Sequence, residues 1–420
     1  MRLRVVQYGT TVGILESTSD RGIVFRYDSY YLADPKALSI SNSLPLRETE
    51  YPQSEALPFF SGLLPDEDQR RRIADYLHVS EGSTARLLDA LGGEYAGILS
   101  LMREDEDTAS GGEKAENESG YKEIPELELA SILLESEQRP LLAPKEGSRL
   151  SLAGAQDKLP ILFRNGCWYR PIGGSPSSHM LKPSSRAFPD LAANEFVCIR
   201  FAGAFGLNVP NVNLGSIGRP VLIVDRFDRE IEKDGGITRL HQVDACQALG
   251  TMPDRKYQSD GGPGFSDISD LIRSVCTSPL RDLEALVKVA LFNLLIGNCD
   301  AHGKNFSFLH RSGEINLSPF YDLVSTTVYP GLTTNLSMRF GSQYSIALVG
   351  IDDLSRFAKD IGVRLGMVKD SLSSLKEAAP AAWATVTSVP ELENYHNLVE
   401  TIHRDWEIRV GRLWRDKGVL

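Results

Sequence analysis

The sequence predicts an α+β fold, with strands concentrated in the first half of the chain and helices in the second. Residues 2–27 alternate apolar and polar side chains with the period of strands, and Gly9-Thr10-Thr11 forms a turn between them. From His241 onward, segments with helical spacing dominate. The 420 residues, of which 42% are hydrophobic and 24% charged, suffice for two or three folded domains. We therefore expect a globular protein and exclude the disordered, collagen-like and disulfide-scaffold classes.

Composition divides the chain into four segments. Residues 1–103 are predicted to form a β-rich N-terminal subdomain. Residues 104–123 are predicted to be an acidic flexible linker, because the stretch 103–123 contains eight acidic and three basic residues and carries −5 of the net charge of −11. Residues 124–227 are again rich in strands, and residues 228–420 are mainly helical.

Local patterns predict the elements of the last two segments. A helix follows Ile124, Asn165-Gly166 marks a hairpin, and the run RPVLIVDRFDR from Arg219 is a buried strand that leads into a charged segment. The other expected elements are a strand at 178–182, helices at 194–205 and 283–296, and a hairpin in which FSFLH and INLSPF pair around Ser312-Gly313.

The net charge and the cysteines restrict the possible functions. A charge of −11 has the wrong sign for broad contact with nucleic acid, so any DNA contact should be local or made through a partner. The five cysteines are at least 23 residues apart without a CxxC pair, which argues against a disulfide framework or a zinc site. The most apolar stretch, from Leu286, is broken by Lys288 and Asn293, so we expect neither secretion nor a membrane span. A cytoplasmic protein fits best.

The strongest chemical signal is the segment NCDAHGKN at residues 298–305. Asp300 precedes Asn305 by five positions, the spacing of a kinase catalytic loop, in which the aspartate accepts the proton of the attacking hydroxyl and the asparagine holds magnesium. The spacing alone also arises by chance in turns. However, antiparallel pairing in the hairpin that follows places Asn305 beside Asp322. We therefore predict an ATP-dependent phosphotransferase with a two-lobed, protein-kinase-like fold, in which Asp300 is the catalytic base and Asn305 and Asp322 are ligands of Mg²⁺.

A phosphotransferase also needs groups that bind the nucleotide phosphates. Lys182 closes an apolar strand and is the candidate cation, with Glu195 near the start of the next helix as its ion-pair partner. The sequence contains neither GxGxxG nor GxxxxGK[ST], so another loop must cover the phosphates. Residues 151–158 (SLAGAQDK) have suitably small side chains, although a tight strand connection would use the same residues.

A second segment, His403-Arg404-Asp405, spells the kinase triplet but is interpreted differently. The residue five positions on is Val410, and only ten more residues follow it in this sequence. The spacing instead predicts an amphipathic helix. Its expected packing residues are Trp406, Val410 and Leu413, and its expected exposed residues are Arg404, Arg409, Arg412, Arg415 and Lys417.

The ordered segments SLAGAQDK, SHMLK, NEFVC, VDRFDR, SDGGPG, NCDAHGKNFS and SPFYD resemble the HipA family of bacterial toxin serine/threonine kinases. VGILE, SLPL and FFSGLLPD are similar to that family's N-terminal subdomain, so the resemblance covers almost all of the chain. It implies a type II toxin–antitoxin system with a HipB-like helix-turn-helix antitoxin, through which DNA is contacted only indirectly. The SDGGPG loop at residues 259–264 matches the family, and we interpret it as a helix connection.

The resemblance also assigns roles by position. Ser151 matches the autophosphorylated serine, whose modification ejects the phosphate loop and switches the kinase off. A phosphate there adds about −1.5 to −2 charges where ATP phosphates should bind. The implied nucleotide site comprises the phosphate loop (Ala153, Gly154, Ala155, Gln156, Asp157 and Lys158), the phosphate contact Lys182, the adenine border (Asp225, Arg226 and Phe227), and His302, Gly303, Lys304, Asn305, Tyr321 and Asp322.

In family terms, the substrate would be a component of translation, typically an aminoacyl-tRNA synthetase, and the outcome would be growth arrest. Two alternatives remain open. One is a non-catalytic subunit that binds the antitoxin as a co-repressor, against which the presence of every expected kinase residue argues. The other is a small-molecule phosphotransferase, against which the SLAGAQDK loop and the N-terminal subdomain argue.

Overall fold

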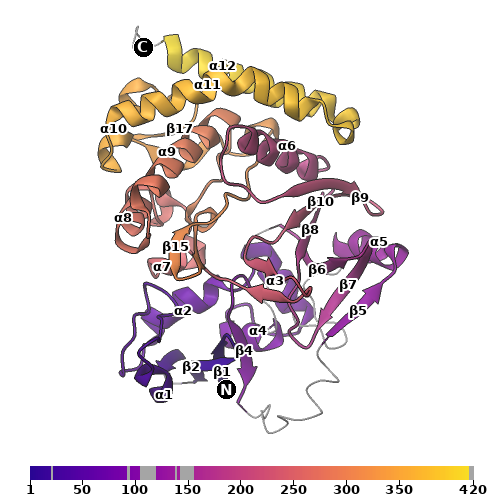
Figure 1. Ribbon diagram of the computed structural model, residues 1–420, viewed down its shortest axis with the longest axis vertical. Helices are drawn as coiled ribbons and strands as arrows, with labels where there is room; N and C mark the ends of the chain where they lie inside the picture. The colour runs from indigo at the N-terminus through magenta and orange to yellow at the C-terminus, as the bar shows by residue number, and fades with distance from the viewer. Residues whose placement is uncertain (20–21, 92–94, 105–119, 138–139, 142–155, 416–420) are drawn as a thin grey trace.

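The computed structural model describes residues 1–19, 22–91, 95–104, 120–137, 140–141 and 156–415. Figure 1 shows a long molecule with the N-terminal strands at one end and the C-terminal helices at the other. A second strand-rich unit lies between them.

The N-terminal subdomain is built on a four-stranded antiparallel sheet in the order β3-β2-β1-β4. In β1 (Arg2–Gln7), Leu3, Val5 and Gln7 are buried and their neighbours are not, which is the alternation that the sequence predicted. The Phe60 ring packs against Phe25 with ring centroids 5.3 Å apart. The remaining elements are β2 (Thr10–Thr18), β3 (Gly22–Tyr27), β4 (Ser100–Arg103), α1 (Ser29–Ala33), α2 (Gln53–Gly62), α3 (Glu67–Tyr76) and α4 (Thr84–Leu91).

The middle unit is a six-stranded antiparallel sheet in the order β5-β7-β6-β8-β10-β9, with α6 packed against β9 and β10. Residues 120–123, which composition assigned to the linker, belong to the edge strand β5 instead. Their polar composition reflects the edge position, since Lys122 and Glu123 are exposed there. The elements are β5 (Gly120–Ile124), β6 (Leu159–Arg164), β7 (Cys167–Ile172), β8 (His179–Pro183), β9 (Val212–Ser216), β10 (Pro220–Asp225), α5 (Glu126–Leu134) and α6 (Leu191–Ala204).

The C-terminal part is mainly helical, with a three-stranded sheet in the order β13-β14-β15. A strand rather than a helix begins at His241, because β13 pairs with β14 and extends the predicted hairpin. The helices are α7 (Ala245–Ala248), α8 (Phe265–Val275), α9 (Pro279–Ile296), α10 (Ile351–Asp360), α11 (Leu365–Thr387) and α12 (His396–Arg415). The strands are β11 (Arg229–Ile231), β12 (Ile237–Arg239), β13 (His241–Asp244), β14 (Ser307–Arg311), β15 (Glu314–Leu317), β16 (Asn335–Phe340) and β17 (Gln343–Ser345).

Helix α12 buries the expected packing residues Trp406, Val410 and Leu413, but two of the arginines expected on its exposed face are not exposed. Trp406 is fully buried and stacks on Phe205 of the middle unit, with ring centroids 5.4 Å apart. Arg409, expected on the exposed face, is buried instead. Its guanidinium donates to Leu295 O at 3.1 Å and to Thr327 Oγ1 at 2.7 Å. It thereby satisfies a carbonyl at the C-terminal end of α9 that has no partner within the helix.

Arg412 is half-buried and donates to Ile346 O at 2.6 Å and to Ala347 O at 2.8 Å. Lys417 and the side chain of Arg415 lie outside the described part of the chain.

All five cysteines are free thiols, and four of them are buried. Within the described part of the chain, no helix combines the length and the apolar character needed to cross a bilayer.

Candidate active site

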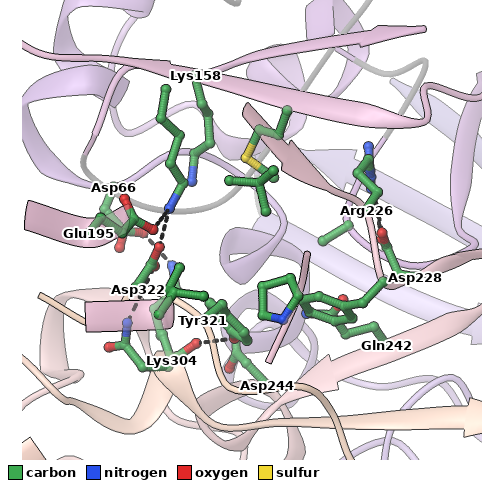
Figure 2. Close-up of a pocket in the computed structure, with 18 of the residues that line it drawn as sticks. Asp66, Lys158, Glu195, Arg226, Asp228, Gln242, Asp244, Lys304, Tyr321 and Asp322 are labelled. Atoms are coloured by element: carbon green, nitrogen blue, oxygen red, sulfur yellow. Dashed lines mark hydrogen bonds and ion pairs between the residues drawn. The ribbon is translucent and has the colours of Figure 1, made fainter. Parts of the chain in front are cut away.

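A pocket lies where the three parts of the chain meet. Its walls come from the end of α2, from β8 and α6, from the end of β10, and from the residues that follow α9 and β15. Met180, Ile199 and Val224 give it an apolar wall, which suits a planar base. Figure 2 shows the carboxylates of Asp66, Glu195 and Asp322 on one side of this pocket and the Arg226–Asp228 pair on the other.

Lys182 lies at the centre of an ion-pair cluster. Its Nζ is 2.6 Å from Glu195 Oε1 of α6 and also contacts Asp322 Oδ1. Burial alone would lower the pKa of Lys182, but the charges of Asp322 and Glu195 outweigh burial and raise it, so the amine stays protonated. The predicted pair between Lys182 and Glu195 is therefore present, with a second acid added to it.

The hairpin of β14 and β15 brings Asn305 and Asp322 together, as its predicted antiparallel pairing requires. Phe308 pairs with Leu317 in the hairpin, and beyond its open end Asn305 Nδ2 lies 3.3 Å from Asp322 Oδ2. Asp322 has a φ of 54°, in the left-handed region that non-glycine residues rarely adopt. Strain of this kind collects at functional sites. The carboxylate of this strained residue contacts both Lys182 and Asn305.

The start of the loop between α9 and the hairpin is held by several hydrogen bonds. Helix α9 ends at Gly297, whose φ of 79° lets the chain turn sharply. Asn298 Nδ2 donates to Asn293 Oδ1 at 3.0 Å, and the Asp300 N–H donates to Asn298 Oδ1 at 3.0 Å. From β16, Ser337 Oγ donates to Cys299 O at 2.7 Å. These contacts therefore fix the backbone that leads into Asp300, the predicted base.

The donor set around Asp322 suits a magnesium ion, which takes oxygen ligands and is usually held by one or two carboxylates together with substrate phosphates. Burial would raise the pKa of Asp322, but the charges of Lys182 and Lys158 lower it to about 2, so the carboxylate is ionised at neutral pH. Asn305 Oδ1 accepts from His302 N at 3.2 Å and keeps a second lone pair. Among the described residues, no three His, Cys, Asp or Glu side chains are grouped as metal ligands.

Asp300, the predicted base, is exposed and stands two residues before His302, which lines the pocket. Its Oδ1 accepts a hydrogen bond from Tyr257 Oη at 2.9 Å. The exposed position suits a group that must meet the hydroxyl of a large substrate.

Two of the three residues expected to border the adenine have side chains with a clear role at the pocket. The Phe227 ring stacks on Tyr321 with centroids 5.5 Å apart, and both residues line the pocket. Tyr321 is fixed by its own hydroxyl, which donates to Lys304 O at 2.6 Å. Asp225 also lines the pocket, and His179 Nε2 lies 3.1 Å from its carboxylate.

Arg226, the third residue of that group, turns its side chain toward the N-terminal subdomain. The guanidinium donates to Asp228 Oδ2 at 2.7 Å and to Tyr95 O at 3.1 Å, while Gly97 N donates to Asp228 Oδ2 at 2.8 Å. Burial would raise the pKa of Asp228, but the charges of Arg226 and Arg229 lower it well below its ordinary value. The side chain of Arg226 therefore joins two parts of the chain, and the residue also lines the pocket.

Only the last part of the predicted phosphate loop is described. Asp157 accepts hydrogen bonds from Gln69 at 2.5 Å and from Arg72 at 3.0 Å, both on α3, so it anchors the loop to the N-terminal subdomain. Lys158 lines the pocket, and burial lowers its pKa to about 8 against the opposing charge of Asp322. Gln156 lies just before these residues. Four predicted residues lie outside the described part of the chain: Ser151, Ala153, Gly154 and Ala155.

Residues 302–304 are close to the pocket, each in a different way. His302 is buried, its Nδ1 has no hydrogen-bond partner among the described residues, and burial lowers its pKa to about 3, so the ring is neutral. A Cβ on Gly303 would lie 2.9 Å from Cys246 Sγ, so glycine allows the close approach of the loop. The Lys304 amine contacts the carboxylate of Asp66.

Asp66 is a site residue to which the sequence analysis gave no role. It is buried, and its carboxylate contacts Lys304 Nζ and lies 3.4 Å from Lys256 Nζ. Burial would raise its pKa, but the charges of Lys304 and Lys256 lower it. The available signal was its place at the end of FFSGLLPD, a segment shared with the family. Its partners Lys256 and Lys304 are 190 and 238 positions away in the sequence, so no local sequence pattern could connect them to Asp66.

Comparison with known proteins shows the relationship of the chain. Residues 150–383 match the family model of the HipA-like C-terminal domain, and residues 3–102 match that of the HipA N-terminal domain. The chain belongs to the HipA family. Protein Y4mE of Sinorhizobium fredii is 41% identical over 379 residues, which are 90% of either chain. The serine/threonine-protein kinase toxin HipA of Shewanella oneidensis is 31% identical over 368 residues, which are 83% of this chain and 80% of that toxin.

A solved structure shows the same fold. HipA from the Shewanella oneidensis MR-1 complex of HipA, HipB and operator DNA matches with a TM-score of 0.83 and 26% identity, and the match covers 99% of this chain and 100% of that one. This confirms the predicted α+β kinase-like fold and the HipA resemblance. The chain is thus a member of a family that contains serine/threonine kinase toxins.

Proposed function

We propose that this HipA-family chain transfers the γ-phosphate of ATP to a serine or threonine hydroxyl of a protein and thereby acts as the toxin of a toxin–antitoxin pair. The observation that carries the proposal is the convergence of Lys182, Asn305 and Asp322 in one pocket. A buried acid, Glu195, fixes the lysine from the opposite side. The name of the Shewanella oneidensis relative supports the reaction class.

Each side chain has a separate task in this transfer. The Lys182 ammonium would bind a phosphate oxygen, and Glu195 would keep the ammonium in place. Asp300 would accept the proton of the attacking hydroxyl as the hydroxyl oxygen bonds to the γ-phosphorus and the bond from that phosphorus to the β–γ bridging oxygen breaks. Asn305 and Asp322 would hold Mg²⁺. When bound, the ion would neutralise charge on the phosphates.

Three finer features belong to the same proposal. Autophosphorylation at Ser151 would switch the kinase off, because the added charge would compete with the phosphates of ATP. A HipB-like antitoxin would be the partner, as HipB is in the solved complex of the relative, and DNA would be reached through that partner. The substrate would be a cytoplasmic component of translation, such as an aminoacyl-tRNA synthetase, and its modification would arrest growth.

The replacement Asp300→Asn tests the reaction. We expect the purified variant to bind ATP and to melt at the wild-type temperature but to lose phosphoryl transfer from labelled ATP. Asp370→Asn, which removes an exposed acid from α11, should transfer phosphate like the wild type and serves as the matched control. Transfer at the wild-type rate by Asp300→Asn would contradict the role of the base. Mass spectrometry of the wild type after incubation with Mg-ATP should find phosphate on Ser151.

A second candidate function, a non-catalytic co-repressor, is suggested by the operator DNA in the relative's complex. Growth separates the two functions. Induced wild-type protein should arrest growth, and induced Asp322→Ala protein should not, although both would still bind the antitoxin. Equal growth arrest by the two proteins, or none by either, would favour the co-repressor.

A further inference from the structure

The segment from Met252 to Gly264, to which no role was assigned beyond a connection, packs directly against the catalytic loop. The Gly303 N–H donates to Lys256 O at 3.3 Å, and the Tyr257 ring lies edge-on to His302 with centroids 5.3 Å apart. On its other side, Gln258 Oε1 accepts from Arg339 N of β16 at 2.9 Å. The segment is therefore held between the catalytic loop and the strand that supports that loop.

The segment folds back on itself so tightly that one position excludes any side chain. A Cβ on Gly262 would lie 2.0 Å from Arg255 O and 2.8 Å from Tyr257 O. The Gly262 N–H donates to Tyr257 O at 2.9 Å and closes the turn. This fold fixes the backbone on both sides of Tyr257.

Tyr257 directs its hydroxyl at the predicted base. The phenol Oη donates to Asp300 Oδ1 at 2.9 Å, while the ring rests on His302. Tyr257 is only partly buried and does not belong to the wall of the nucleotide pocket. Tyr257 therefore contacts Asp300 from outside the nucleotide pocket.

The residue before Tyr257 ties the segment to the N-terminal subdomain. The side chain of Lys256 is 3% exposed, and its Nζ lies 3.4 Å from the buried carboxylate of Asp66, which also binds Lys304 of the catalytic loop. One carboxylate thus holds both the segment that carries Tyr257 and the loop that carries Asp300. The distance between these two residues is therefore fixed by a buried ion pair as well as by their own hydrogen bond.

We propose that Tyr257 is a positioning residue for Asp300: its hydroxyl holds the carboxylate in one orientation toward the hydroxyl of the protein substrate, and the Lys256–Asp66 pair keeps Tyr257 in place. The inference rests on the proposed kinase function. Without this hydrogen bond, the carboxylate would rotate about its side-chain bonds, and only some of its conformations could accept the proton. Because the hydroxyl of Tyr257 restricts this rotation, it raises the rate without contacting ATP.

The replacement Tyr257→Phe removes the hydroxyl and keeps the ring on His302. We expect kcat to fall about tenfold, while the KM for ATP and the calorimetric affinity for Mg-ATP stay at their wild-type values. Tyr257→Leu, which also removes the ring contact, should lower kcat at least as much. Lys256→Met, which frees the segment from Asp66, should lower kcat in the same way and leave the binding of Mg-ATP intact.

Tyr31→Phe is the matched control, because it removes a hydroxyl that donates to Leu38 O at 2.8 Å in the N-terminal subdomain. It should leave kcat unchanged. A wild-type kcat in Tyr257→Phe would overturn the proposal, and so would a loss of Mg-ATP affinity as large as the loss of kcat, because the residue would then act through the nucleotide site. A purified wild type without any phosphoryl transfer would instead overturn the proposed function, and this inference with it.

Discussion

Two clusters of charged side chains lie at the pocket, and their compositions are opposite. In one, the Asp66 carboxylate lies between the ammonium groups of Lys256 and Lys304. In the other, the Lys182 ammonium lies between the carboxylates of Glu195 and Asp322. The first cluster carries one excess positive charge and the second one excess negative charge. Together they join the N-terminal subdomain, the middle sheet and the catalytic loop.

The exposure of their members separates the two clusters. The side chains of Asp66, Lys256 and Lys304 are 2%, 3% and 4% exposed. In the second cluster the side chains of Lys182 and Glu195 are as deeply buried as those of the first cluster, but the Asp322 side chain is 37% exposed. A fully buried charge whose partner is removed cannot be rescued by water, so the first cluster serves as a fixed joint. The acid of the second cluster is partly open to solvent, as the proposed metal ligand would have to be.

The largest expected effect comes from breaking the exposed cluster at Asp322. Asp322→Asn keeps the shape of the side chain but removes the charge that would face Mg²⁺, so phosphoryl transfer should fall about a thousandfold or more. Because the acid is partly exposed, the melting temperature should change little. Rates with labelled ATP and thermal unfolding measure the two effects. Asp352→Asn, at an exposed acid of α10, is the control and should match the wild type in both. A decline of less than tenfold in Asp322→Asn would contradict the assignment.

Breaking the buried cluster should have the reverse profile. Asp66→Asn removes the carboxylate that the buried Lys256 and Lys304 amines share, so the free energy of unfolding should fall by about 3–5 kcal/mol. Denaturant titration measures this loss. Asp68→Asn, two residues away, breaks an ion pair with Arg71 whose side chains are 84% and 60% exposed, and it should change the free energy by about 0.5 kcal/mol or less. Equal stability of the two variants would remove the distinction between the clusters.

The sequence predicted the exposed cluster better than the buried one, for a physical reason. Asn305 and Asp322 are joined by a hairpin, and antiparallel pairing across Ser312-Gly313 determines which residues meet at its open end. Lys182 and Glu195 are only thirteen positions apart, on a strand and the helix that follows it. Contacts of this range follow from local patterns. The roles of these residues in catalysis stay predictions until they are tested.

Two contacts that the sequence did not predict join distant segments. Asp66 meets Lys304 across 238 positions, and Arg409 meets the end of α9 across 114 positions. No periodicity or spacing encodes such pairs, because they depend on how whole subdomains dock. Composition misled at residues 120–123 for a related reason. A polar edge strand and a polar linker have the same residue content, and only pairing with β7 distinguishes them.

A third buried acid at the same pocket, Asp244, differs from Asp66 because it accepts a hydrogen bond from a backbone amide. Gln247 N donates to its Oδ1 at 2.8 Å. Burial raises its pKa from 3.8 to about 6, and the charge of Lys304 only partly opposes this. Since the folded pKa lies above the unfolded value, the protonated form favours folding. This contribution is complete below about pH 4 and is lost as the pH rises through about 6.

Asp244→Asn should therefore stabilise the protein at neutral pH, in contrast to Asp66→Asn. Asparagine keeps an oxygen for Gln247 N and carries no charge at any pH. A pKa difference of about two units, which already includes the attraction to Lys304, corresponds to a gain of about 2–3 kcal/mol. The difference in free energy of unfolding between variant and wild type, measured at pH 7.5 and at pH 4.5, isolates this group, because the other carboxylates titrate alike in both proteins. A gain at pH 7.5 that shrinks toward pH 4.5 is the expected result. A variant less stable than the wild type at pH 7.5 would mean that Lys304 supports Asp244 as firmly as it supports Asp66, and the two acids would then belong to one joint.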